Sequence, residues 1–447
     1  MNFLIDKQTL DDLNIFGKQR GAIYNLFNET QTRGGARILE EMFRYPVADA
    51  GLINRRSQII RHFQQQQTGF PFRNETFDII EQYLENIDER SILTAEEDNL
   101  QRKLKNMVGA DTVFDQLQKG ILACIEMFNR LREFMQSSGI REENNWKKEG
   151  DELWQLLNEP QFEWVYEEKN SKKLAFTKVA TQDRLFRFTM REKVKKLLHH
   201  IYHLDVYISV AKVATNKKLA FGTVVENSGN FIRIDNMFHP ALSAPVANSV
   251  TIDENSNLIF LTGANMAGKS TFMKTLGITV FLAHMGFPVP AEGMEFAVQG
   301  GLFTTINLAD NLNMGYSHFY AEVLRLKNVA EQAARTSRLM IIFDELFRGT
   351  NVKDAFDATV AVTEAFAEKK ECTFIISTHI IEAGEVLKEK CSNINFVYFP
   401  TIMKDSMPEY TYRLSDGITN DRHGMMIINN ENIIGILNNR IRNLKPA

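Results

Sequence analysis

Residues 258–271 read LIFLTGANMAGKST, an apolar run that ends in a glycine-rich turn. The apolar start predicts a buried strand, and the residues after Thr271 predict an apolar helix. Between them, Gly263 to Ser270 match the pattern G-x-x-x-x-G-K-[ST], which in this context forms a loop that binds phosphate groups. A chance match within an ordinary turn is the alternative, and the flanking strand and helix disfavour it.

The residue types of this loop suit phosphate binding. Glycines let the backbone wrap around a phosphate and direct several N–H groups at it, at the positive end of the following helix. Lys269 supplies charge to the outer phosphates of a nucleotide, and Ser270 offers a hydroxyl to Mg²⁺. The residues expected to contact the nucleotide here are Gly263, Asn265, Met266, Ala267, Gly268, Lys269, Ser270 and Thr271.

Two further apolar runs end in polar residues that suit a hydrolytic site. Residues 339–343 precede Asp344 and Glu345, so Asp344 is expected to hold Mg²⁺ and Glu345 to orient or deprotonate a water. Residues 373–377 precede Thr378 and His379, whose imidazole would lie near the γ-phosphate. The alternatives are a solvated turn for the two carboxylates and a structural role for His379.

The segment of residues 310–319 reads DNLNMGYSHF and opens a predicted helix near Tyr320. A helix N-terminus that carries a serine offers a second anion site, which makes Ser317 a candidate phosphate contact. A plain N-cap is an equally good interpretation of the residues alone.

The pattern of the chain changes near residue 220. Residues 221–430 alternate strand and helix signals, which predicts an α/β domain with a mostly parallel sheet. Residues 1–220 predict a helical domain, with long helices over 96–138 and 183–218 that form a core and lever, and a short connecting unit over 139–182. The remaining residues, 431–447, are expected to form a C-terminal dimerisation helix.

Composition limits the class of protein. A chain of 447 residues is longer than one core usually fills, and its net charge of -4 does not indicate nucleic-acid binding by the chain as a whole. Three widely spaced cysteines argue against a disulfide framework and favour a reducing compartment, with the cytoplasm as the expected location. Neither a signal peptide nor a membrane span is predicted.

One predicted helix carries a local excess of basic residues. They are Arg184, Arg187, Arg191, Lys193, Lys195, Lys196, Lys212, Lys217 and Lys218, and they suit contacts to nucleic-acid phosphates or form a solvated face. The same helix carries His199, His200 and His203, and a metal site on the pair His199 and His203 needs further ligands that the sequence does not show.

Taken in order, these motifs resemble the MutS family of ABC-type ATPases, known for DNA mismatch repair. The loop is similar to the family's T-G-P-N-M-G-G-K-S-T, Asp344 to Thr350 to its D-E-x-G-R-G-T, and Ser377 to His379 to its A-T-H. Residues 310–319 resemble D-D-L-x-x-G-x-S-T-F, and residues 32–39 resemble the T-x-x-G-x-R-x-L of the family's core domain. The resemblance extends over nearly the whole chain.

The resemblance implies an ABC-type P-loop ATPase domain that uses ATP and Mg²⁺. It implies a homodimer in which Ser317 of one subunit completes the nucleotide site of the other, and adenine contacts near Val246 and Ala247. It also implies a truncated form that lacks the family's mismatch-binding and connector domains.

The leading hypothesis is a MutS-like ATPase that couples ATP hydrolysis, with Lys269, Glu345 and His379 as catalytic residues, to clamping of duplex or branched DNA in repair or recombination. Repair or recombination proteins are the expected further partners, with no membrane contact. The alternative is a nucleotide-switched protein that binds a protein or ribosomal RNA partner. A transporter ATPase subunit is disfavoured because the segment around Ser317 lacks an L-S-G-G-Q sequence.

Overall fold

The computed structural model describes residues 3–17, 21–93, 110–137, 139, 146–226, 229–307, 318–347, 349–404, 407–419 and 433–437. By their contacts, these residues form two units. An α/β unit comprises Met1–Leu26, Tyr45–Ser57 and Lys217–Ala447, and a helical unit comprises Phe27–Arg44 and Gln58–Asn216. The chain is therefore helix-rich with mixed α/β sheets, which agrees with the predicted fold class at that level.

A seven-stranded sheet forms the centre of the α/β unit. Its order is β1 (Leu4–Ile5), β8 (Gly301–Thr305), β9 (Leu339–Phe343), β10 (Thr373–Ser377), β5 (Leu258–Gly263), β11 (Ile394–Phe399) and β14 (Ser415–Asp416). All neighbours are parallel except β11 and β14. The three strands predicted from apolar runs, β5, β9 and β10, lie side by side, and every residue in them is buried.

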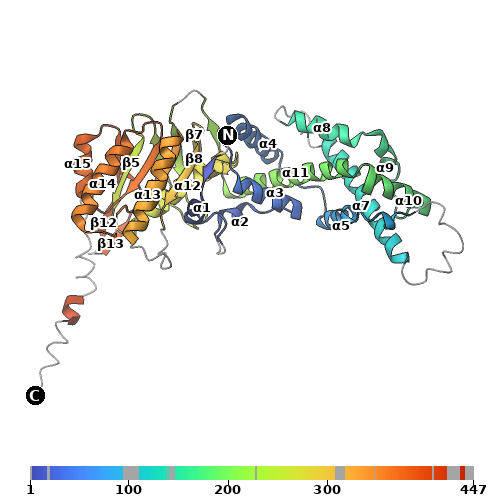
Figure 1. Cartoon of the computed structure of the whole chain (residues 1–447), viewed down its shortest axis with the longest axis horizontal. Coiled ribbons are helices and arrows are strands. Elements are labelled where there is room, and N and C mark those ends of the chain that lie inside the picture. The colour runs from blue at the N-terminus through green and yellow to red at the C-terminus, as the bar shows by residue number, and fades with distance from the viewer. Residues whose placement is uncertain are drawn as a thin grey trace, which may run out of the picture. The chain divides into compact units, whose positions relative to one another are not determined.

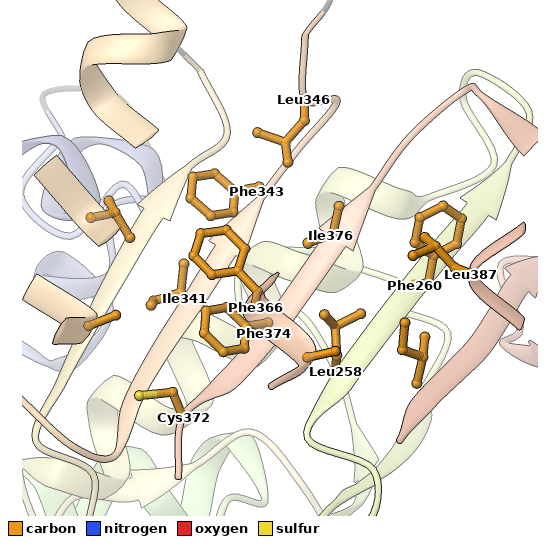
Figure 2. Close-up of a cluster of buried hydrophobic side chains, with 14 of the residues drawn as sticks. Leu258, Phe260, Ile341, Phe343, Leu346, Phe366, Cys372, Phe374, Ile376 and Leu387 are labelled. Atoms are coloured by element: carbon orange, nitrogen blue, oxygen red, sulfur yellow. The ribbon is translucent and has the colours of Figure 1, made fainter. Parts of the chain in front are cut away.

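Helices cover both faces of this sheet. Figure 1 shows α13 (His318–Arg335), α14 (Val352–Ala367) and α15 (Ile381–Lys390) along the strands. Their apolar side chains share a core with alternate strand residues, and Figure 2 shows the rings of Phe343, Phe366 and Phe374 gathered there. α12 (Lys269–His284) lies on the other face, because its Gly277 approaches the side chain of Ile342, which alternates with Ile341 and Phe343.

The described residues of the unit form two smaller sheets as well. One has the order β4 (Asn248–Ile252), β3 (Ile232–Met237), β7 (Gly293–Phe296), β2 (Ala220–Val224) and β6 (Pro288–Val289). The other pairs β12 (Thr401–Lys404) with β13 (Met407–Tyr410). No described helix is both long and apolar enough to span a bilayer.

The helical unit is built around two long helices, α7 (Ala110–Ser137) and α11 (Arg191–Lys217). The shorter elements are α3 (Arg33–Arg44), α5 (Asn74–Glu85), η1 (Glu89–Ser91), α8 (Lys147–Leu157), η4 (Pro160–Phe162), α9 (Glu163–Glu167), α10 (Phe176–Arg184) and η5 (Leu185–Thr189). Asp205 of α11 accepts hydrogen bonds from Thr32 N at 2.8 Å and Thr32 Oγ1 at 2.7 Å, which tie down the start of α3. Gly35 leaves room for that carboxylate, because a Cβ there would lie 2.4 Å from Asp205 Oδ2.

The units differ from the predicted boundary at residue 220. β1 pairs with β8 through Leu4 and Gly301, and α1 (Lys7–Asp12) follows it, so the first residues of the chain pack in the α/β unit. α2 (Ile23–Phe27) ends where the chain enters the helical unit, and α4 (Ala50–Gln66) has residues in both units. Each unit therefore combines segments that are distant in the sequence, as the pairing of β1 with β8 shows.

One of the long helices differs from its predicted bounds. The helix predicted over 183–218 is interrupted by the π-helical turn η5, closed by Met190 N donating to Leu185 O at 2.8 Å, and α11 begins at Arg191. Of the helix predicted over 96–138, residues 110–137 are helical as α7, and its predicted start lies outside the described residues. The connecting unit predicted over 139–182 holds α8, η4, α9 and most of α10. Of the predicted dimerisation helix over 431–447, residues 433–437 are described, and they are helical.

Candidate nucleotide site

The loop between β5 and α12 has a backbone that the glycines make possible. Gly263 has φ +143° and Gly268 has φ +109°, both outside the range that side chains favour. Met266 also lies at positive φ, +67°, and is 80% exposed. The turn therefore adopts, at Gly263 and Gly268, backbone conformations that glycine reaches most easily.

Lys269 lies inside this turn. Its side chain is buried, and Nζ donates to the carbonyl oxygens of Gly263 at 2.8 Å and Ala264 at 3.2 Å. The loop's own carbonyls thus hold the ammonium group beside the backbone N–H groups of the turn, where an anion would meet both.

The order of the strands brings the other predicted residues to the same edge. β10 lies between β9 and β5, so the carboxyl ends of these parallel strands meet. Asp344, after β9, accepts from Ser270 Oγ at 2.5 Å through Oδ2 and from Ser377 Oγ at 2.5 Å through Oδ1. A carboxylate and a hydroxyl in contact are the oxygen ligands that Mg²⁺ takes beside phosphate groups.

Glu345 and His379 form a second pair at this edge. Glu345 has φ +57°, and its N–H donates to Ser377 O and Ser377 Oγ, both at 3.1 Å. His379 Nε2 lies 2.6 Å from Glu345 Oε1. A half-buried carboxylate held by an imidazole is suited to orient or accept a proton from water.

A cavity of about 420 Å³ extends from the loop. Asn265, Lys269, Ser270, Thr271 and Glu345 line its polar part, and Phe238, His239, Leu242, Val246 and Tyr412 are among the residues of its other part. Val246 is 38% exposed within this wall, whereas Ala247, also described, is not among the residues that line it. Of the two residues predicted to contact adenine, Val246 therefore lines the cavity and Ala247 does not.

Tyr412 is a wall residue that the sequence did not identify. A Cβ on Gly268 would lie 3.2 Å from Tyr412 Cδ1, so the ring lies against the loop. Asn248 holds the segment there, because its Nδ2 donates to Tyr412 O at 3.0 Å and its Oδ1 accepts from Leu414 N at 2.7 Å. Burial, with a smaller effect of the charge on Lys274, lowers the pKa of His239 in the same wall, which keeps this ring uncharged near neutral pH.

Two predicted regions lie partly or wholly outside the described residues. Ser317 and the segment before it fall in 308–317, and position 348 of the D-E-x-G-R-G-T match is also outside. The role predicted for Ser317 therefore stays a prediction.

The basic residues of α11 are mostly paired with acidic ones. Lys193 lies 2.5 Å from Glu159, Lys212 lies 2.8 Å from Glu29, and Lys196 pairs with Glu152. Arg187, in η5, is fully buried and pairs with Asp183, so it is not available to a phosphate and its inclusion in the predicted basic face is wrong. Partners on other elements, which the helix's own sequence does not reveal, neutralise much of the predicted basic face.

Two histidines of α11, His199 and His203, lie close together. Nε2 of His199 and Nε2 of His203 lie 3.2 Å apart. Among the described residues, no group of three or more metal-ligating side chains is found.

Family models match the chain in both units. Residues 8–211 match the model of MutS domain III, and residues 259–441 match that of MutS domain V. The DNA mismatch repair protein MutS of Leuconostoc mesenteroides subsp. mesenteroides is 32% identical over 253 residues, which are 54% of this chain and 29% of that protein. The protein of the same name from Petrotoga mobilis is 34% identical over 195 residues, 43% of this chain and 24% of the relative.

The matched stretch thus spans less than a third of each of these relatives. The two domain models, in contrast, cover most of this chain and come from one family. The chain belongs to the MutS family.

Proposed function

We propose that the α/β unit is an ABC-type P-loop ATPase domain that binds ATP with Mg²⁺ and hydrolyses it. The observation that carries this proposal is the convergence of Lys269, Ser270, Asp344, Glu345 and His379 at the shared edge of β5, β10 and β9. These five residues come from three separate stretches of sequence. If each of these residues had only a separate structural role, their side chains would not need to lie together at one edge of the sheet.

The site fits the two groups it would hold. Ser270 Oγ and Asp344 Oδ2 already touch, at 2.5 Å, and are the residues that would hold Mg²⁺. The triphosphate would follow the backbone of residues 264–268, and the base would enter the cavity between Val246, His239 and Tyr412. Tyr412 supplies the aromatic surface that Val246 does not.

The chain's own residues divide the chemistry among them. Lys269 offers a positive charge to the terminal phosphates, and bound Mg²⁺ would neutralise further charge on the same oxygens. Glu345 orients the attacking water and accepts its proton, and His379 holds the Glu345 carboxylate in place from 2.6 Å.

One loop and one Ser317 segment per chain support a homodimer. In this arrangement the serine of one subunit reaches the nucleotide held by the partner, so a complete site needs two chains. Hydrolysis then weakens the contact between subunits and changes the grip of the helical units on their partner.

For that partner we infer duplex or branched DNA, bound during mismatch repair or recombination together with other repair proteins. Membership of the MutS family and the relatives' name, DNA mismatch repair protein MutS, support it. The second candidate is a nucleotide-switched protein that binds a protein or a ribosomal RNA. The ion pairs on α11 leave less positive charge for nucleic-acid phosphates, and this favours a protein partner within that candidate.

The deciding experiment measures phosphate release at saturating ATP and Mg²⁺ while homoduplex, mismatched and four-way-junction DNA and ribosomal RNA are titrated separately. The Lys269→Ala variant is the control for contaminating ATPase. Stimulation and binding by any DNA at moderate salt support the DNA proposal. Stimulation by RNA alone would favour the second candidate, and no release above the control would refute the ATPase.

A further inference from the structure

His239 lines the nucleotide cavity from a turn that holds its ring in place. His239 O accepts from Leu242 N at 3.2 Å, and Pro240 takes the second position of this turn, where proline is favoured. The side chain bonds to the same turn, because His239 Nδ1 accepts from Ala241 N at 3.3 Å. The imidazole is therefore oriented before any ligand binds.

This contact also determines which ring nitrogen carries the proton. Burial, followed by the charge of Lys274, lowers the pKa of His239, so the ring is neutral near pH 7. A neutral imidazole has a single N–H group, and Nδ1 is an acceptor here, so the proton is on Nε2. Nε2 makes no hydrogen bond to any residue that the structure describes. The ring thus presents an unused donor.

Few other side chains of the cavity can supply such a donor. Outside the phosphate-binding loop, most of the described lining side chains are apolar, and Glu345 is a carboxylate, which accepts. Asn248 Nδ2 donates to two backbone carbonyl oxygens, at 3.0 and 3.4 Å, and Thr275 Oγ1 donates to another at 2.7 Å. His239 Nε2 and the Tyr412 hydroxyl remain as donors for a ligand in this wall.

We propose that His239 contacts the base of the bound nucleotide, with Nε2–H donating to a ring nitrogen of adenine. This inference rests on the proposed function, in which ATP occupies the cavity. The ring nitrogens of adenine are acceptors and its exocyclic amine is a donor, so a donor on the protein pairs with the ring. Because Ala241 N already holds the imidazole, little side-chain freedom is lost when this bond forms.

The contact makes His239 a residue that determines specificity. A base without the acceptor leaves Nε2–H without a partner, so it binds more weakly. The competing acceptors are the ribose hydroxyl oxygens. Nucleotide analogues separate the two, because the 1-deaza, 3-deaza and 7-deaza forms each replace one ring nitrogen by C–H, whereas the 2′-deoxy and 3′-deoxy forms each remove one hydroxyl.

The test measures Kd by titration calorimetry with ADP and these five analogues of ADP, so no turnover disturbs the measurement. We expect the unmodified protein to bind one of the three deaza analogues about three- to tenfold more weakly than ADP. His239→Asn keeps an oxygen that can accept from Ala241 N but is too short to present a donor at the place of Nε2. This variant should bind ADP weaker by the same factor and should not distinguish ADP from that analogue.

Tyr412→Phe is the matched control, because it removes the other donor of the same wall and should keep the full preference for ADP over that analogue. Thermal unfolding checks the fold of each variant. If His239→Asn unfolds, His239→Phe replaces it, since phenylalanine keeps a planar ring without the N–H group.

Two results would overturn the inference and leave the proposed ATPase standing. One is equal binding of ADP and all three deaza analogues by the unmodified protein, which needs no variant. The other is a loss in His239→Asn that is the same for ADP and every deaza analogue, or that disappears only with a deoxyribose analogue. Failure of the unmodified chain to bind either ADP or ATP would overturn the proposed function, and the inference with it.

Discussion

A buried ion pair in the helical unit gives a sharp prediction about stability. The side chains of Asp183 and Arg187 are both fully buried. Asp183 Oδ1 accepts from Arg187 Nε at 2.6 Å and from Tyr83 OH at 3.0 Å. Burial, with the nearby charge of Asp183, raises the pKa of Tyr83, so its hydroxyl remains a donor.

Replacing Asp183 with Leu leaves the guanidinium buried without its counter-charge and Tyr83 without its acceptor. Arg187 Nη1 keeps its bonds to Asn86 O and Ser91 Oγ, both at 2.8 Å, but the Nε and Nη2 groups lose Asp183 as their acceptor and the charge has no counter-charge. We therefore expect the free energy of unfolding of this unit to fall by about 3–5 kcal/mol. The double variant Asp183→Leu, Arg187→Met removes both charges and should be more stable than the single variant by about 2 kcal/mol or more.

Tryptophan fluorescence during urea unfolding measures this change. All three tryptophans, Trp146, Trp154 and Trp164, lie in the helical unit, so the signal reports on that unit. A single variant that loses less than about 1 kcal/mol, or a double variant no more stable than the single, would refute the argument from buried charge.

Three further predictions concern the α/β unit. Gly268→Ala places a side chain at φ +109° and against the ring of Tyr412. We expect the affinity for an ATP analogue to fall about tenfold, and the free energy of unfolding measured in urea to fall by about 1–2 kcal/mol. Tyr412→Ala should raise Kd for ATP about tenfold with little effect on kcat at saturation, whereas Tyr412→Phe should bind normally. Burial lowers the pKa of His284 to about 4. As the pH falls below about 6.5, the unfolded chain therefore binds a proton at this residue before the folded chain does. Stability should fall by about 2–3 kcal/mol between pH 6.5 and 4.5, and urea unfolding of His284→Gln should show a weaker pH dependence.

Local patterns predicted the three strands that carry the candidate site. The apolar runs before Gly263, Asp344 and Thr378 are β5, β9 and β10, and the parallel order of these strands makes their ends meet. Each such run is buried on both faces, so its sequence is continuously apolar and easy to recognise.

Contacts between distant segments could not be predicted in this way. β1 has only two residues, too few to show a period, although it carries the start of the chain into the sheet. Tyr412 reaches the loop because Asn248 holds it, and neither residue belongs to a recognisable pattern. Lys193 and Lys196 look available on their own helix, and their glutamate partners lie on other elements of the unit.

Phosphate release by Glu345→Gln tests most directly whether the edge of β5, β9 and β10 is an ATPase site. The substitution keeps the shape of the side chain and its place beside His379 but removes the base. We predict that this variant binds as much ATP per chain as the unmodified protein and releases phosphate about a hundredfold more slowly or less. Equal rates of phosphate release in the two proteins would contradict the assignment of Glu345 and, with it, the proposed mechanism.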